Sequence, residues 1–161
     1  MKNTKILFVC LGNICRSPAA EAILTKKINN ADLQWNISVD SAGVMGYHTG
    51  EQADMRMKQH ANLRGYEITS IARRFNPEKD FDEFDFIITM DNENFSDITH
   101  KDIEGKYSKK IHKMIEFCTT NKVNEVPDPY YGGKEGFEKV LDILEDGCEG
   151  LLDNIKDGTE Y

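Results

Sequence analysis

A cysteine and an arginine lie six positions apart near the start of the chain, as Cys10 and Arg16. A cysteine thiolate is a nucleophile, and an arginine guanidinium binds two oxygens of a phosphate with its planar fork. Together they can attack a phosphate ester and hold the group that is transferred. The spacing alone is weak evidence, because a chain with four cysteines and five arginines can contain it by chance.

The residues around this pair make the signal more specific. The apolar run Ile6–Val9 leads into Cys10 and predicts a strand that is buried on both faces. Gly12-Asn13 breaks the run, and Ser17-Pro18 predicts the cap and the first turn of a helix. Such a loop can wrap backbone N–H groups around one dianion, with the helix N-terminus aimed at it. The same positive field favours the thiolate, to which the serine hydroxyl can donate; the alternative is a buried structural cysteine, which does not require this loop.

Transfer of a phosphoryl group also needs a proton for the leaving oxygen. Asp128 is the best candidate for this acid, because Pro127 and Pro129 restrict the backbone and hold the carboxyl group out. Aspartate is also common beside proline in ordinary turns, so the local sequence leaves both interpretations open.

The pattern of apolar residues predicts strands that alternate with helices. The predicted strands are 6–9, 35–41, 84–90 and a short one at 67–72, and the predicted helices are 17–28, 51–64, 92–99 and 135–155. Segment 110–117 fits either type, 126–133 is a loop because of its prolines and glycines, and the polar tail 156–161 is expected to fray. We therefore expect a single α/β domain over residues 1–161, with a mainly parallel sheet that binds ligands at the carboxyl ends of its strands.

Composition argues against several other classes of protein. The 161 residues suit one domain and contain no apolar run near the ~18 residues of a membrane span. The apolar run at 6–11 is also shorter than the core of a secretory signal. A net charge of −8 disfavours nucleic acid and anionic membranes as partners.

The cysteines and histidines show no metal-binding spacing. There is no Cys-x-x-Cys pair among Cys10, Cys15, Cys118 and Cys148, and the histidines are equally scattered, at His48, His60, His100 and His112. Four thiols in a chain of this length, with no export signal, indicate a reducing compartment. We therefore expect no metal, no cofactor and a cytoplasmic location.

Three segments resemble the low-molecular-weight protein tyrosine phosphatases in matching order: Phe8–Pro18, Asp40–Gly43 and Val126–Tyr130. The similarity spans nearly the whole chain. It implies a four-stranded parallel sheet flanked by helices, with a phosphate-binding loop after the first strand. It also implies a cysteinyl-phosphate intermediate, with Cys10 as nucleophile, Arg16 as phosphate clamp and Asp128 as the acid and then the base for water.

The resemblance assigns further residues around the loop. Asn13, with Ser41 behind it, is expected to hold the loop in a strained shape, and Ser17 to steady the thiolate. The residues that it implies for substrate binding are Leu11, Gly12, Asn13, Ile14, Cys15, Ser17, Tyr47, Tyr130 and Tyr131. The tyrosines would stack on an aromatic ester, the alternative being partly buried surface aromatics. The implied substrates are phosphotyrosine proteins or small phosphomonoesters, with inorganic phosphate as a product inhibitor.

Two positions depart from the family pattern, and a third has two interpretations. Tyr47 stands where many family members have tryptophan. Ser70 stands where some have a histidine that supports the loop, so the support is expected to differ here. Cys15 is either a small packing residue or the partner of oxidised Cys10 in a protective disulfide, which the family favours.

Two other functions compete with the phosphatase. A thioredoxin-coupled arsenate reductase shares the fold and the loop but needs a closely spaced downstream cysteine pair, whereas Cys118 and Cys148 are thirty residues apart. A non-catalytic phosphate-binding module would not need both Cys10 and Asp128. The sequence leaves open the physiological substrate (phosphoarginine included), the oligomeric state, and phosphorylation of Tyr130 or Tyr131.

Overall fold

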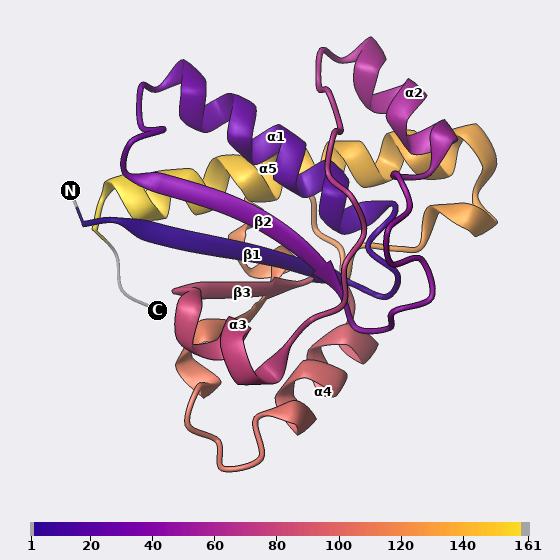
Figure 1. The fold of residues 1–161 in the computed structure, drawn as a ribbon. Coiled ribbons are helices and arrows are strands. Elements are labelled where there is room, and N and C mark those ends of the chain that lie inside the picture. The colour runs from indigo at the N-terminus through magenta and orange to yellow at the C-terminus, as the bar shows by residue number, and fades with distance from the viewer. Residues whose placement is uncertain (1, 159–161) are drawn as a thin grey trace.

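The computed structural model describes residues 2–158, and its centre is a parallel four-stranded sheet (Figure 1). The strands lie in the order β2 (Ile37–Gly43), β1 (Thr4–Cys10), β3 (Phe86–Thr89) and β4 (Ile111–Lys113). Residues 6–9 of β1 are all 0% exposed, because β1 pairs with a strand on each edge and is covered on each face. The predicted sheet is confirmed.

Helices cover both faces of the sheet (Figure 1). They are α1 (Arg16–Asn30), α2 (Met55–Leu63), α3 (Pro77–Glu83), α4 (Asn92–Lys101) and α5 (Gly133–Lys156). Ile6 and Phe8 of β1 belong to the core cluster that contains α1 and α5, whereas Leu7 and Val9 belong to the cluster that contains α3 and α4. Successive side chains of a strand point to opposite faces, so one continuous apolar run serves both cores.

The start of α1 differs from the prediction. The helix begins at Arg16, and Cys15 occupies the cap position without a side-chain cap hydrogen bond. Ser17 lies in the first turn, so its predicted role as the helix cap is wrong. Its hydroxyl is instead turned toward the sulfur of Cys10. The first N–H groups of α1 therefore carry no side-chain cap, as an anion-binding helix start requires.

Other elements differ in extent or type. The segment 67–72 is not a strand; the described residues give it only an isolated bridge between Gln52 and Ile71. Helix α3 has no counterpart among the predicted elements. The ambiguous segment 110–117 contains β4 and then the 3-10 turn Met114–Phe117, and the predicted loop 126–133 contains the 3-10 turn Pro129–Tyr131. In the predicted tail, Lys156 is the last residue of α5, and 159–161 lie outside the described residues.

Candidate active site

The loop between β1 and α1 places the predicted nucleophile and clamp at the carboxyl edge of the sheet. Cys10 is the last residue of β1 and Arg16 the first of α1, and they are 3% and 4% exposed. Between them, Asn13 has a φ of 60°, in the left-handed region that costs energy for most residues and that asparagine tolerates better than most other residues with a side chain. The loop therefore holds a local strain that its neighbours must offset.

A chain of hydrogen bonds leads from outside the loop to the thiol. The backbone N–H of Arg73 donates to Oδ1 of Asn13 at 3.0 Å, and Nδ2 of Asn13 donates to Oγ of Ser17 at 2.8 Å. Oγ of Ser17 in turn lies 3.0 Å from Sγ of Cys10. These three contacts connect the backbone of Arg73 to the thiol of Cys10.

Arg16 is fixed from behind by one of its two terminal nitrogens. Nη1 donates to Oδ2 of Asp91 at 2.7 Å and to the carbonyl oxygen of Val126 at 3.0 Å. Nε and Nη2 make no hydrogen bond to residues 2–158, which leaves the bidentate edge of the guanidinium for an oxyanion. Burial acts to lower the pKa of Arg16, but the interactions with Cys10 and Asp91 outweigh it and raise the pKa above its usual value.

Asp91 is a site residue that the sequence analysis missed. It follows β3 at the same sheet edge as the loop and also caps α4 by accepting from the N–H of Asn94. The position after a parallel strand was the available signal, because such positions meet at one edge.

Asp128 faces the same hollow as the loop. The hollow holds about 80 Å³, far less than the several hundred of a drug-sized pocket, which suits a single phosphoryl group. Oδ1 of Asp128 accepts from the N–H of Tyr130 at 3.0 Å, and Oδ2 accepts no hydrogen bond from residues 2–158. The hollow is lined by Cys10, Leu11, Gly12, Ile14, Cys15, Arg16, Tyr47, His48, Asp128 and Tyr130.

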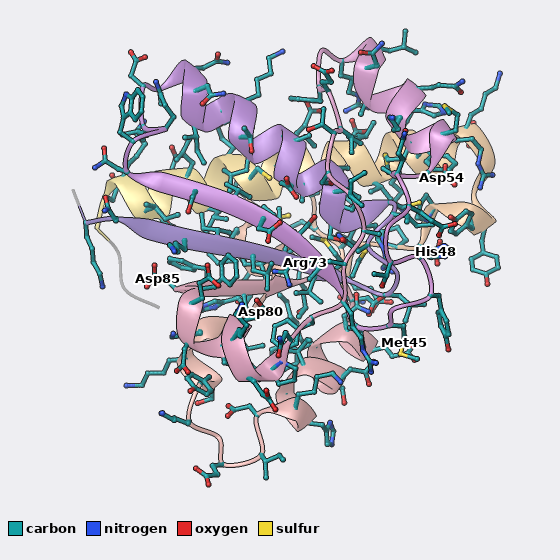
Figure 2. All side chains as sticks on the ribbon, in the orientation of Figure 1. Met45, His48, Asp54, Arg73, Asp80 and Asp85 are labelled. Atoms are coloured by element: carbon teal, nitrogen blue, oxygen red, sulfur yellow. The ribbon has the colours of Figure 1, made fainter. Side chains whose placement is uncertain are left out.

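The three predicted tyrosines do not behave alike. Tyr47 and Tyr130 line the hollow, whereas Tyr131 is 92% exposed and is not among its lining residues. The hydroxyl of Tyr130 donates to Oδ2 of Asp54 at 3.2 Å, which ties this wall to the start of α2. His48, which also lines the hollow, was not predicted as a site residue. Figure 2 shows it at the same end of the molecule as Asp54. Its Nδ1 lies 2.5 Å from Oε2 of Glu51.

Cys15 is a buried residue of the loop, 5% exposed. Its side chain is hydrogen-bonded to Tyr130, but burial dominates and raises the pKa of the Cys15 thiol to about 12. All four cysteines are free thiols. Cys15 is therefore protonated at neutral pH in the reduced protein.

The expected support residues occupy different places. Asn13 and Ser17 lie in the hydrogen-bond chain described above. Ser41 pairs in register with Phe8 of β1, and its hydroxyl donates to Glu21 at 2.6 Å rather than to the loop. The hydroxyl of Ser70 makes no hydrogen bond to the described part of the chain.

Two negative findings apply to residues 2–158. No three histidine, cysteine, aspartate or glutamate side chains come together there as a metal site would require. None of the helices in that range combines the length and the apolar character that a membrane span needs.

The fold and the site define a class of protein: a parallel α/β domain with a cysteine- and arginine-bearing anion loop after its first strand. The family profile described as "Low molecular weight phosphotyrosine protein phosphatase" matches residues 5–160. A human protein with that same name is 36% identical, over 92% of this chain and 93% of the relative.

Solved structures agree with the family profile. A protein tyrosine phosphatase from Entamoeba histolytica is 51% identical, with a TM-score of 0.93 over 97% of this chain and 99% of the other. A drosophila arginine phosphatase is 31% identical, with a TM-score of 0.86 over 97% and 98%. The chain belongs to the low molecular weight phosphotyrosine protein phosphatase family. The predicted family, fold and enzyme class are therefore confirmed.

Proposed function

We propose that this enzyme hydrolyses phosphotyrosine-type monoesters through a phosphate covalently bound to Cys10. The observation that carries the proposal is one hollow of about 80 Å³ lined by a thiol, the clamp Arg16 and the carboxyl group of Asp128. These are the nucleophile, the charge stabiliser and the proton donor that phosphoryl transfer needs.

The first step forms a P–S bond and breaks the P–O bond of the ester. The thiolate of Cys10, oriented by the hydroxyl of Ser17, attacks phosphorus from the floor of the hollow. The Nε–Nη2 edge of Arg16 and the loop N–H groups bind the equatorial oxygens, and Asp128 gives its proton to the leaving phenolic oxygen. The products are cysteinyl phosphate and a neutral phenol.

The second step regenerates the thiolate. The carboxylate of Asp128 takes a proton from water, and the water oxygen attacks phosphorus. The P–S bond breaks, its electron pair returns to Cys10, and inorganic phosphate leaves with the new P–O bond. Free phosphate fits the same cradle, so we expect competitive product inhibition.

The rim supports aromatic substrates. Tyr47 is 74% exposed beside the hollow, and Leu11 and Tyr130 are each about two-fifths exposed, so an aryl ring can rest between apolar surfaces. The relative named as an arginine phosphatase makes phosphoarginine the alternative substrate class. A phosphoguanidinium group would gain less from this apolar rim than an aromatic ester.

Location and redox control belong to the same proposal. The four free thiols support a reducing compartment, for which the cytoplasm is our proposal. A sulfenic acid on Cys10 can condense with the thiol of Cys15, with release of water, to form a protective disulfide.

The rival functions have less support. Cys148 is 0% exposed and Cys118 is half-buried, which does not favour the exposed relay of disulfides that an arsenate reductase needs. A module that only binds phosphate does not need a carboxyl group in the same hollow as a thiol.

One assay separates these functions. Wild-type protein in excess EDTA is offered p-nitrophenyl phosphate, phosphotyrosine and phosphoarginine peptides, and arsenate with thioredoxin. We expect hydrolysis of the aryl esters, with a higher kcat/KM for phosphotyrosine than for phosphoarginine. Activity that EDTA abolishes and one divalent ion restores, or turnover of arsenate alone, would contradict the proposal.

A further inference from the structure

The hydroxyl of Ser17 has one proton and three polar neighbours. Sγ of Cys10 lies at 3.0 Å, Nδ2 of Asn13 at 2.8 Å and the carbonyl oxygen of Ala42 at 3.5 Å. The proposed mechanism works only if that proton points at the sulfur, because a thiolate needs a donor. The direction of the hydrogen bond between Ser17 and Cys10 therefore bears on the reactivity of the thiol.

The direction is set at the other end of this series of hydrogen bonds, at the backbone N–H of Arg73. A backbone N–H can only donate, so the group of Asn13 that faces it, at 3.0 Å, must be the amide oxygen. The amide nitrogen of Asn13 must then face Ser17 and donate to its oxygen. The serine proton is left for the sulfur of Cys10, which is closer than the carbonyl oxygen of Ala42.

The side chain of Arg73 holds that N–H in place. Its guanidinium contacts Asp40 on β2, with Nε at 3.1 Å and Nη2 at 3.0 Å from Oδ2. It also contacts Asp80 in α3, with Nη1 at 3.0 Å from Oδ2 and Nη2 at 3.3 Å from Oδ1. Figure 2 shows Arg73 and Asp80 close together where α3 faces the sheet.

This clamp around Arg73 is partly buried, because the side chain of Asp80 is 4% exposed, that of Arg73 32% and that of Asp40 46%. Asp80 is 3% exposed and also accepts from the N–H of Asn76 at 2.7 Å. The carbonyl oxygen of Arg73 accepts from the N–H of Gly43, the residue paired with Cys10 across the sheet. Both the side chain and the backbone of Arg73 are thus fixed to elements that flank the loop, which favours one orientation of its N–H.

We propose that Arg73 is a positioning residue that fixes the direction of the hydrogen-bond chain from its own N–H through Asn13 and Ser17 to Cys10. The inference rests on the proposed role of Cys10 as nucleophile. It also accounts for Ser70, whose hydroxyl makes no hydrogen bond to the described residues, because the support of the loop comes from Arg73 instead.

The test compares Arg73→Met with Arg74→Met, which removes the exposed arginine next in sequence and serves as the matched control. Each folded protein is treated with iodoacetate across a pH series, and the rate of Cys10 carboxymethylation is measured beside kcat, KM and inhibition by phosphate. Asp80→Asn weakens the clamp without removing Arg73, and Arg73→Lys keeps its charge. The charged groups around Arg73 are Asp40 and Asp80. Glu21 also lies nearby, where it accepts from the hydroxyl of Ser41.

We expect Arg73→Met to lower kcat by about 10–100-fold, the range found when groups behind a reactive site are removed. Its carboxymethylation profile should move to higher pH, because the thiolate loses an oriented donor. Asp80→Asn and Arg73→Lys should move both quantities in the same direction by less, and Arg74→Met should match wild type.

A purely structural role predicts something different: a lower melting temperature with an unchanged carboxymethylation profile and unchanged kcat. That result, in Arg73→Met or in Asp80→Asn if the first variant does not fold, would overturn the inference. Carboxymethylation reports on Cys10 whether or not it is the nucleophile. Activity that survives in Cys10→Ser would therefore refute the proposed function without being confused with failure of the Arg73 inference.

Discussion

Nη1 of Arg16 lies 2.7 Å from Oδ2 of Asp91, and the two side chains are only 5% and 18% exposed. This ion pair uses one corner of the guanidinium and leaves the Nε–Nη2 edge without a hydrogen bond to residues 2–158, in a side chain that lines the hollow. Arg16 is therefore oriented before substrate arrives, which reduces the reorganisation that catalysis would otherwise require.

Replacing Asp91 with asparagine tests this orientation. Asparagine caps a helix as well as aspartate does, so α4 should keep its start while Arg16 loses its charged partner. We expect a fall in kcat of about 10–100-fold and weaker inhibition by vanadate. Steady-state kinetics provide the measurement, with the exposed Glu93→Gln on the same helix as control. Equal kcat in the two variants would contradict the role of Asp91.

Asp128→Asn tests the proton donor. The variant can still accept from the N–H of Tyr130, so the loop should keep its shape. We expect kcat for phenyl phosphate to fall by about 10²–10⁴-fold. The loss should be smaller for p-nitrophenyl phosphate, whose leaving group needs less help from a proton. An equal loss of kcat/KM, which does not include breakdown of the cysteinyl phosphate that both esters share, would count against Asp128 as the acid.

The buried thiol of Cys15 makes a prediction about pH. Because burial raises its pKa to about 12, the thiolate fraction increases about tenfold per pH unit throughout the neutral range. After peroxide treatment, closure of the Cys10–Cys15 disulfide should therefore become faster between neutral and mildly alkaline pH. Peptide mapping and recovery in dithiothreitol measure it, with Cys118→Ser as control. If Cys15→Ser recovers as well as wild type and no crosslink is found, Cys15 has only a packing role.

Asp146 on α5 predicts how stability depends on pH. Burial acts to raise its pKa, but the N–H groups of Thr119, Asn121 and Thr120 outweigh it and hold the pKa well below the usual range. A lowered folded-state pKa means that the stabilisation is complete above the unfolded value of about 3.9 and is lost as pH falls below it.

We expect Asp146→Asn to lower the free energy of unfolding by about 1–3 kcal/mol at neutral pH, because asparagine has one oxygen where the N–H groups need two. The difference from wild type should shrink in acid. Urea unfolding at both pH values measures it, beside the exposed Asp153→Asn on the same helix. A difference that stays constant with pH would show that the charge of Asp146 contributes nothing.

The contiguous part of the site could be predicted from sequence. Cys10, Asn13, Arg16 and Ser17 lie within one loop, so their proximity follows from the chain itself. The cap assignment of Ser17 was wrong because Ser-Pro is a common helix start, whereas here the helix begins at Arg16 and the hydroxyl of Ser17 lies against the sulfur of Cys10.

Residues far apart in the sequence were harder to predict. Asp91 and Arg73 reach the loop across separations of 75 and 60 residues, through pairings that only the assembled sheet defines. The segment 67–72 has strand-like burial, with Ile68 and Ala72 inside, but it lacks a neighbour with which to form a ladder. The seven-residue α3 was too short for a periodic signal, although Asn76 and Pro77 mark its start.

The most direct test of the central claim is to trap the phosphate on Cys10. Asp128→Asn should still react with p-nitrophenyl phosphate, since that leaving group needs little acid, but should hydrolyse the product slowly because the base for water is missing. Acid quenching within milliseconds, followed by peptide mapping, should find phosphate on Cys10 and none in a Cys10→Ser control that still binds vanadate. Phosphate on another residue, or steady turnover by Cys10→Ser, would contradict the account.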